Sequence, residues 1–590
     1  MGPLEQAITD LVRAHGDGLP GVDPGRLADV LVAPTAQPAV GDLEIDLSPV
    51  VDASASRPAV EELARRLRES DAVERVTPIP PRVYLRPSVP FLLDTVVPAV
   101  VAAGDAFGRG NQGEGQPALI AFSDPNLNKP LHLGHLRNNF LGMALATLLA
   151  NQGYDVVRNS LHSDWGIHIC QALLAYLKWG EGVTPESTGT KGDHFAGTWY
   201  VRFHQENEQQ RRGQKGAAVA EPTPLEQEAG DLLRRVETGE PEAVALNARL
   251  TQWVEDGMLE TYARIGTRLD LIYRETATWP FARAFLDQAL ADGRAQRRPD
   301  DSVCVDLSHL DLPEVTFLRG DGTPLVYASW LGIDTQRFPL REWARTIQVS
   351  GKEWESGEDL YTHAMGVLGT GWLDHWEHAH HGMVRLPHGK MRSREGSFVS
   401  ADPLLDGLTD QLLQEWGKED PEATTAAHRH TCDRLALGLL KYHFLRARRL
   451  KDIPYEEQAL LDRALPAFAT IVGTLAWAEQ QASEPDDDTA GLPDSPCVRQ
   501  VLLQLDDLPR IARQALARLE TADVARWLDD LCLPVGVCRR KGGLPAGMAG
   551  AVAVGIRRGL ALLNVEPPPD LTSLPPAFSS EVSTRARRPR

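Results

Sequence analysis

Two histidines three residues apart stand beside a lysine and a glycine in the segment NKPLHLGHLRNNFLG, Asn128–Gly142. Imidazoles at this spacing could hold a metal, bind phosphate at a helix start, or lie on a surface. A metal site would need further ligands, and no Glu or Cys stands nearby. A helix N-terminus attracts anions through its free N–H groups and its dipole. His132 and His135 are therefore candidate phosphate ligands, and Gly134 would let a flat ring such as adenine approach the backbone.

A second cationic segment follows about 250 residues later. The stretch GKMRSREGSFVS, Gly389–Ser400, carries Lys390, Arg392 and Arg394 between glycines. A loop of this kind can close over a triphosphate and stabilise the leaving pyrophosphate. The alternative is a solvated basic loop without a ligand.

The elements around the histidines predict a parallel sheet. ALIAFS indicates a buried strand, HLGHLRNNFLGMALATLLANQG a helix ending at Gly153, and YDVVRNSLHSDWG a second strand. A strand, helix and strand within about forty residues form a βαβ unit, whose ligand crevice lies at the C-terminal ends of the strands. Asp164 and Trp165 follow the second strand at that edge. The alternative is that Trp165 is core and Asp164 caps a helix.

Composition limits the remaining possibilities. The 590 residues, 42% hydrophobic and 24% charged, suggest three or four domains, and no apolar run looks long enough to cross a bilayer. Six scattered cysteines without a CxxC pair indicate a reduced, cytoplasmic protein without structural zinc. The net charge of -20 means that any nucleic-acid contact must use a local basic face.

Taken together in this order, these segments resemble the class I aminoacyl-tRNA synthetases, and most closely the arginyl enzymes. HLGH is similar to the HIGH motif of the family, SDWG to its Gly-Asp-Trp-Gly, and GKMRS to its KMSKS loop. VGDLEIDLS and VTPIPPRVYLR resemble the added N-terminal domain, and LLQLDDLPRIARQALARLETADVARWLDDLC resembles the helical anticodon-binding domain.

The resemblance implies an α/β fold with a Rossmann-like catalytic domain at 113–405, interrupted by a helical insertion at about 180–270. A small α/β domain that contacts the tRNA elbow would occupy 1–108, and an all-helical anticodon-binding domain 420–575. Residues 576–590 would form a disordered basic tail.

The resemblance also implies a reaction. ATP, with Mg²⁺, would activate arginine to an aminoacyl-adenylate, and the acyl group would pass to tRNA; we expect a monomer without membrane contact. His132 and His135 would contact the ATP phosphates, and Gly134 would lie against the adenine. Lys390 keeps the first lysine of KMSKS, whereas Ser393 stands in place of the second. The nucleotide-binding candidates on this loop are Lys390, Met391, Ser393 and Arg394, and Lys129, just ahead of the HIGH motif, could replace the missing cation.

The amino-acid pocket departs from the family. Tyr327 is present, but Trp330 and Leu331 replace an Arg-Asp pair whose carboxylate grips the substrate guanidinium. The nearest carboxylate is Asp334, about one helical turn away. The remaining candidate substrate residues are Asn126, which matches the family, Asp124, where a Ser is usual, and Asp164.

Three functions stay open. In the first, the carboxylate that binds arginine has been relocated to Asp124, Asp334 or an acid of the segment GKEWESGEDLY, namely Glu353, Glu355, Glu358 or Asp359. In the second, the enzyme activates a different amino acid or feeds a biosynthetic pathway. In the third, the chain is a non-catalytic tRNA-binding protein. For tRNA, the segment KYHFLRARRLK offers Lys441, Arg446, Arg448, Arg449 and Lys451 to a phosphate backbone, and the alternative is a solvated helix face.

Overall fold

The structure is a computed structural model in which residues 2–52, 54–213, 222–372, 376–386, 389–390, 399–421, 425–484 and 495–578 are described. Its contacts divide the chain into two compact units. One holds the described residues from Asn111 to Asp462 with Leu519–Thr521; the other holds those up to Gly110, Arg463–Arg518 and those from Ala522 onward.

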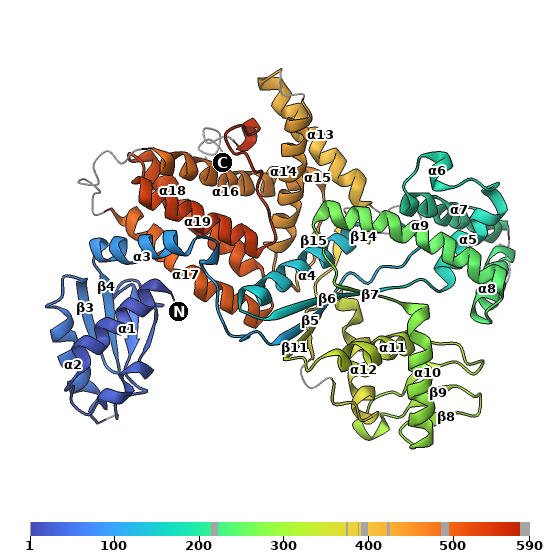
Figure 1. Ribbon diagram of the computed structural model, residues 1–590, viewed down its shortest axis with the longest axis horizontal. Coiled ribbons are helices and arrows are strands. Elements are labelled where there is room, and N and C mark those ends of the chain that lie inside the picture. The colour runs from blue at the N-terminus through green and yellow to red at the C-terminus, as the bar shows by residue number, and fades with distance from the viewer. Residues whose placement is uncertain are drawn as a thin grey trace. The chain divides into compact units, whose positions relative to one another are not determined.

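A five-stranded sheet forms the centre of the Asn111–Asp462 unit, in the order β12-β11-β5-β6-β7 (Figure 1). Every pairing in it is parallel. The strands are β5 Pro117–Ala121, β6 Asp155–His162, β7 Leu271–Arg274, β11 Arg345–Gln348 and β12 Trp376–His378, and α4 Leu133–Asn151 connects β5 to β6. The predicted βαβ unit and α/β fold are thereby confirmed. Because β6 and β11 lie on opposite sides of β5, the strand order reverses there, which is where parallel sheets bind ligands.

Close packing of α4 on the sheet depends on one glycine. A Cβ at Gly142 would lie 2.3 Å from Cγ of Phe122, the residue directly after β5. The helix can approach the strand this closely because glycine has no side chain, and the N-terminus of α4 is thereby held over the end of β5.

Helices fill the connection between β6 and β7. They are α5 Ile167–Trp179, α6 Pro185–Thr188, α7 Gly192–Gly213, α8 Pro224–Glu237 and α9 Pro241–Ile265. Aromatic side chains hold this helical insertion together: Tyr176 of α5 and Phe195 of α7 make edge contacts with Trp253 of α9, with ring centroids 5.8 and 5.6 Å away.

A second layer follows β7. It contains α10 Glu275–Ala291, an antiparallel sheet of β8 Gln296–Arg297, β9 Val303–Val305 and β10 Val315–Leu318, α11 Val326–Arg337 and α12 Glu355–Val367 (Figure 1). Phe317, Leu331 and Met365 belong to one buried cluster that joins β10 to α11 and α12. The cluster fixes α11, which carries the amino-acid-pocket candidates.

The C-terminal part of this unit packs next to α4. It contains β13 Val384–Leu386, β14 Gly389–Lys390, α13 Ala401–Glu419, α14 Ala426–Leu445, β15 Ile453–Pro454 and the short α15 Glu457–Ala459. β13 pairs with both β14 and β15. Phe140 of α4 meets Phe444 of α14 with ring centroids 6.0 Å apart.

The other unit combines both ends of the described chain. Its antiparallel sheet has the order β1-β2-β4-β3, with β1 Leu31–Pro34, β2 Leu43–Asp46, β3 Val73–Ile79 and β4 Arg82–Pro87. The helices are α1 Pro3–Gly16, α2 Ser56–Leu67, α3 Val89–Ala103, α16 Leu465–Ser483, α17 Pro496–Arg518, α18 Ala522–Arg540 and α19 Ala546–Leu562. Arg499 of α17 links it to the sheet through ion pairs with Asp42 and Glu74.

Two expectations need correction in this unit. By length and composition alone, Val89–Ala106 and Glu457–Ala482 are apolar enough to cross a membrane, so the expectation that the sequence holds no such run is wrong. The helix α3 packs on α1, α17 and α19, and α16 packs on α18 and α19, as helices of a shared core do. Pro576–Phe578, expected within a disordered tail, forms a short helix with Phe578 buried against Phe468; the remainder of that tail lies outside the described residues.

A carboxylate from α17 caps α1 and generates a stability prediction. Asp506 accepts the N–H of Leu4 at 2.7 Å, and burial raises the pKa of Asp506 to about 7. Because the folded pKa lies above the unfolded value near 4, folding stability should fall as pH rises from about 4 to about 7. Asp506→Asn should remove this loss and raise the unfolding temperature by a few degrees at pH 8, about 1–2 kcal/mol, and by about a third as much at pH 5.

The measurement is thermal unfolding of both proteins at pH 5 and pH 8. Asp10→Asn, a change on the exposed face of α1, is the control and should shift neither value measurably. Equal effects of Asp506→Asn at both pH values would contradict the assigned cause.

Candidate functional site

A cavity of about 590 Å³ opens at the C-terminal ends of β5 and β11. Its walls include the turn after β5, the N-terminus of α4, the end of β6, the segment after β11, and the facing sides of α11 and α12. The predicted residues Asp124, Asn126, His132, Gly134 and His135 all line it. The sheet therefore brings five sequence-predicted residues to one cavity.

The two histidines cap α4 reciprocally. His132 is the N-cap, and its Nδ1 accepts the N–H of Gly134 at 3.2 Å, while Nδ1 of His135 accepts the N–H of His132 at 3.2 Å. The rings stack with centroids 3.9 Å apart. Because a neutral imidazole has one donor and one acceptor nitrogen, both rings carry their proton on Nε2. Each ring can therefore donate this N–H to a ligand.

The charge state of the histidines follows from their surroundings. Burial, together with the positive charge of Lys129, lowers the pKa of His135 to about 3. Burial, then the charges of His135 and Lys129, hold the pKa of His132 well below its usual range. Lys129 thus acts on both rings, and the helix entrance presents two neutral donors beside one cation.

A short pairing joins the end of the KMSKS-like segment to this entrance. Leu133 donates its N–H to the Val399 carbonyl at 3.2 Å, and Ala401 donates to the Leu131 carbonyl at 2.9 Å, on either side of a bridge between His132 and Ser400. Lys390 lies in β14, whereas Met391, Ser393 and Arg394 lie outside the described residues.

Buried polar side chains of α4 tie its first turns to the rest of the unit. Arg137 donates to the carbonyls of Gly382, Arg449 and Lys451, at 2.6, 2.9 and 2.7 Å. Asn138 accepts the N–H of Ser123 at 2.6 Å and donates to the Val349 carbonyl at 2.9 Å. These bonds fix the histidines relative to β5 and β11. Sequence reasoning missed them, although Arg-Asn-Asn inside an apolar helix was a usable signal.

The turn after β5 places Asp124 in the cavity. Ser123 and Asp124 have left-handed φ angles of 80° and 43°, which non-glycine residues adopt rarely and often at functional sites. Asp124 Oδ1 accepts the N–H of Leu161 at 2.7 Å, and Oδ2 accepts from Gln348 at 3.0 Å. Burial raises the pKa of Asp124, and Arg337 opposes that shift.

Asp334, the carboxylate nearest to the position expected for the family's Arg-Asp pair, is already hydrogen-bonded within the chain. Asp334 is buried, with Oδ1 accepting from Nε of Arg337 at 2.7 Å and Oδ2 from the hydroxyl of Tyr361 at 2.6 Å. Arg337 also donates to Asn159 at 2.9 Å and lines the cavity. The guanidinium that Asp334 binds therefore belongs to Arg337 of this chain.

Aromatic rings form much of the adjoining wall. Trp330 makes edge contacts with Trp354 and Tyr361, with centroids 5.8 and 5.4 Å away, and Trp376 packs under Arg337 at 5.0 Å. Tyr327 stacks on Tyr361 at 6.2 Å. Leu331 is fully buried in the core cluster, so the position expected to carry the family's Asp is part of the apolar core.

Asp164 takes up the capping alternative. Its carboxylate accepts the N–H and the hydroxyl of Thr276 at 2.9 and 2.6 Å, in the first turn of α10. Trp165 lines the cavity and meets Trp279 of α10 edge-on, with centroids 4.6 Å apart. The segment therefore joins β6 to α10 at the edge of the cavity.

Three potential metal ligands gather at one cavity wall. Glu358 Oε2 lies 2.7 Å from Nδ1 of His378 and 2.8 Å from Nε2 of His380. Both imidazoles converge on the same carboxylate oxygen, and hydrogen bonds of this kind lower the pKa of Glu358 against the effect of burial. The three groups therefore satisfy one another.

Two members of the basic cluster proposed for tRNA are internal, whereas Arg446, Arg448 and Lys451 are exposed. Lys441 is only 4% exposed and lies over the Phe140 ring, and Arg449 donates to the His380 carbonyl. The expectation that both face a phosphate backbone is therefore wrong. The helical period could not distinguish a solvated face from one packed on α4.

Comparison with known proteins identifies the family of this chain. The family model of the class I (R) tRNA synthetase catalytic domain matches residues 97–456. An arginine–tRNA ligase of Amoebophilus asiaticus is 37% identical over 355 residues, 59% of each chain, so the match spans less than two thirds of that relative. One of Treponema denticola is 31% identical over 468 residues, 78% of each chain.

The fold is similar to that of Thermus thermophilus arginyl-tRNA synthetase, with a TM-score of 0.69 and 21% identity over 96% of this chain and 99% of that one. The family model covers more than half of the sequence, and a relative above 30% identity is matched over more than two thirds of its length. The chain therefore belongs to the class I aminoacyl-tRNA synthetases of the arginyl type.

Proposed function

We propose that this chain uses ATP to activate arginine as an aminoacyl-adenylate and transfers the arginyl group to a tRNA. One observation carries the proposal: His132 and His135, whose Nδ1 atoms accept backbone N–H groups, lie at a helix N-terminus in a cavity at the sheet's ligand edge. The positive end of a helix dipole and neutral imidazole donors suit a phosphate better than they suit a cation.

The first step is attack of the amino-acid carboxylate on the α-phosphate of ATP, which breaks the bond to pyrophosphate. His132 and His135 donate to phosphate oxygens as charge builds up, while Lys129 adds a positive charge at the same entrance. The sequence offers Lys390, Met391, Ser393 and Arg394 for the far side of the triphosphate. A tRNA ribose hydroxyl then attacks the carbonyl carbon, and AMP leaves.

Magnesium is expected to arrive with ATP. Three of the four carboxylates that line the cavity, Asp124, Glu275 and Glu358, already accept hydrogen bonds from protein groups. This suits an ion held mainly by phosphate oxygens, the usual arrangement for Mg²⁺. The ion would neutralise charge on the phosphates, while the chain orients them.

The amino acid would lie between the turn after β5 and the aromatic wall. Asp124 and Asn126 are suited to the α-ammonium group, because both reach the cavity directly after β5. Gly134 leaves room for the adenine, and Tyr327 supports Trp330 and Tyr361 from behind. Asp334 would act through Arg337, and Asp164 through α10.

A second candidate is the same reaction on a different amino acid, and Arg337 favours it. Its guanidinium occupies Asp334, the carboxylate that could have replaced the family's missing Asp. A buried, paired carboxylate cannot fork a second guanidinium without releasing the first. An uncharged side chain would meet no such conflict at the aromatic wall.

The remaining parts of the proposal concern partners. We propose that a cytoplasmic monomer uses the N-terminal sheet for the tRNA elbow and α16–α19 for the anticodon. The relatives' name, arginine–tRNA ligase, supports tRNA as acceptor.

Exchange of labelled pyrophosphate into ATP, across twenty amino acids with and without tRNA, tests the proposal. Arginine should drive exchange, since it is the substrate proposed. Exchange with another amino acid alone would select the second candidate. Folded protein that exchanges with none would leave a tRNA-binding protein as the remaining function.

Two substitutions at one position separate the roles of His135. Asparagine can still accept the His132 N–H but lacks the distant donor, whereas alanine loses both. His135→Asn and His135→Ala should each lower the rate of adenylate formation by about one to three orders of magnitude. The control is His363→Ala, on the exposed side of α12. Near-normal rates for the asparagine variant would assign His135 a capping role only.

The low pKa values predict a flat acid limb. Because the pKa of His135 is about 3 and that of His132 is also depressed, both rings stay neutral from pH 8 to pH 6 in the free enzyme. Their contribution to kcat/KM for ATP should therefore be constant over this range. A limb near pH 6.5 that disappears in His135→Asn would show that the ring titrates there.

A further inference from the structure

We infer that Asp402 is a positioning residue for the nucleotide site. Its carboxylate ties the start of α13 to helices α7 and α9 of the insertion, and this tie holds residues 399–401 against the entrance of α4. The inference rests on the proposed function for its rate measurement, but its structural part does not.

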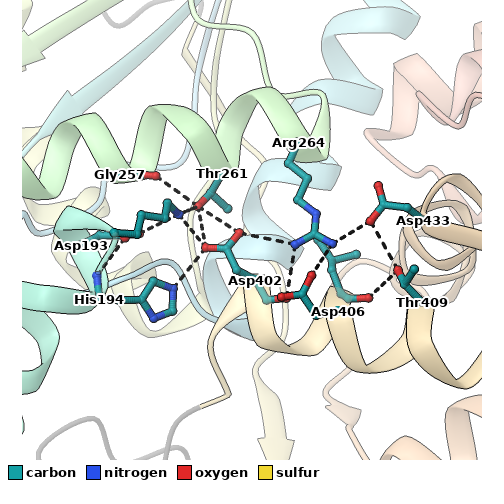
Figure 2. A network of polar contacts seen from close by, with 11 residues as sticks. Asp193, His194, Gly257, Thr261, Arg264, Asp402, Asp406, Thr409 and Asp433 are labelled. Atoms are coloured by element: carbon teal, nitrogen blue, oxygen red, sulfur yellow. Dashed lines mark hydrogen bonds and ion pairs between the residues drawn. The ribbon is translucent and has the colours of Figure 1, made fainter. Parts of the chain in front are cut away.

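Asp402 contacts three residues from two parts of the helical insertion. Oδ2 receives Nζ of Lys191 at 2.6 Å, the hydroxyl of Thr261 at 3.1 Å, and Nε2 of His194 at 3.2 Å (Figure 2). Lys191 directly precedes α7, His194 lies in its first turn, and Thr261 belongs to α9. One carboxylate thus joins three segments.

The tie is largely shielded from solvent. The side chains of Lys191 and Asp402 are 20% and 18% exposed. Burial alone would raise the pKa of Asp402, but hydrogen bonds from His194 and Lys191 hold it well below its usual range. Removing one charge of such a pair leaves the other poorly solvated, which makes the contact directional and costly to break.

The tie is adjacent in sequence to the histidine entrance. Ala401, the residue before Asp402, donates its N–H to the Leu131 carbonyl, and Ser400 bridges His132. From the other side, α7 packs directly on the residue after Lys129: a Cβ at Gly197 would lie 2.8 Å from Cδ of Pro130. The insertion therefore contacts both segments beside the imidazoles, the one that precedes His132 and the one around residues 399–402.

A neighbouring ion pair supplies a matched control. One turn further along α13, Asp406 pairs with Arg264 of α9 at 2.8 Å, and Arg264 also reaches Asp433 of α14 at 2.7 Å (Figure 2). Asp406 is 54% exposed and is not adjacent to the residues that pair with α4. Arg264 also reaches the Asp402 carbonyl at 3.4 Å, so Asp406→Asn removes a charge from the same helix while the contacts of Asp402 with Lys191, His194 and Thr261 stay in place.

The consequence for the reaction follows from geometry. Asp402, Lys191 and Thr261 are not among the residues that line the cavity, so they do not contact a bound substrate there. Loosening them should leave substrate affinity intact and disturb the position of the two Nε2–H donors. Misplacement of donors by about 1 Å can cost up to 100-fold in rate.

The rate experiment uses the full chain in pyrophosphate exchange with tRNA and the amino acid that the wild type accepts. Asp402→Asn and Lys191→Met should each lower kcat about 10- to 100-fold, with KM for ATP and amino acid within about threefold. Lys191→Arg, which keeps the charge, should retain most of the rate. The double variant should be less impaired than the product of the two single effects, because both changes remove the Lys191–Asp402 contact, whereas Lys191→Met also removes the contact with Asp193.

Hydrogen exchange supplies a measurement that needs no activity. In Asp402→Asn, the amides of Leu133 and Ala401 should exchange at least about tenfold faster than in wild type, whereas Asp406→Asn should leave them unchanged. Unaltered protection of both amides would overturn the inference even if the rate fell. If Asp402→Asn shows the faster hydrogen exchange but the wild-type protein activates no amino acid, only the proposed function is overturned.

Discussion

The proposed nucleotide site depends on which ring nitrogens of His132 and His135 bind the backbone of α4. Each ring gives Nδ1 to a backbone N–H at the start of α4, so each must carry its proton on Nε2. The same two bonds cap the helix and select the tautomer. Had either ring faced a backbone carbonyl instead, it would present an acceptor to the cavity and repel phosphate. Helix capping and ligand binding are therefore one arrangement.

That arrangement is held from several directions. Within α4, Arg137 reaches the segment around β13 and β15, and Asn138 links the turn after β5 to the end of β11. Residues 399–401 pair with the strand-like approach to the helix. These bonds are buried and directional, so the donors face a defined point rather than a range of positions.

The amino-acid pocket follows a different principle from the phosphate entrance. Arg337 and Asp334 neutralise each other inside it, and Trp330, Tyr361 and Trp376 supply apolar surface around them. The family's guanidinium-binding carboxylate has become Leu331, which lies in the core. In the proposed function, family membership and side-chain selectivity are separable, because the phosphate chemistry would depend on α4 and selectivity on α11.

The sequence alone determined the βαβ unit, the parallel sheet and the grouping of His132, His135, Gly134, Asp124 and Asn126, because periodicity and topology place strand ends and helix starts at one edge. It also identified the departure at Trp330 and Leu331. Only the tertiary structure decided that Asp334 is taken by Arg337, that Lys441 is buried, and that Lys191 meets Asp402 across 211 residues. Such pairings depend on which helix faces pack together, and no local pattern records the partner of a charge.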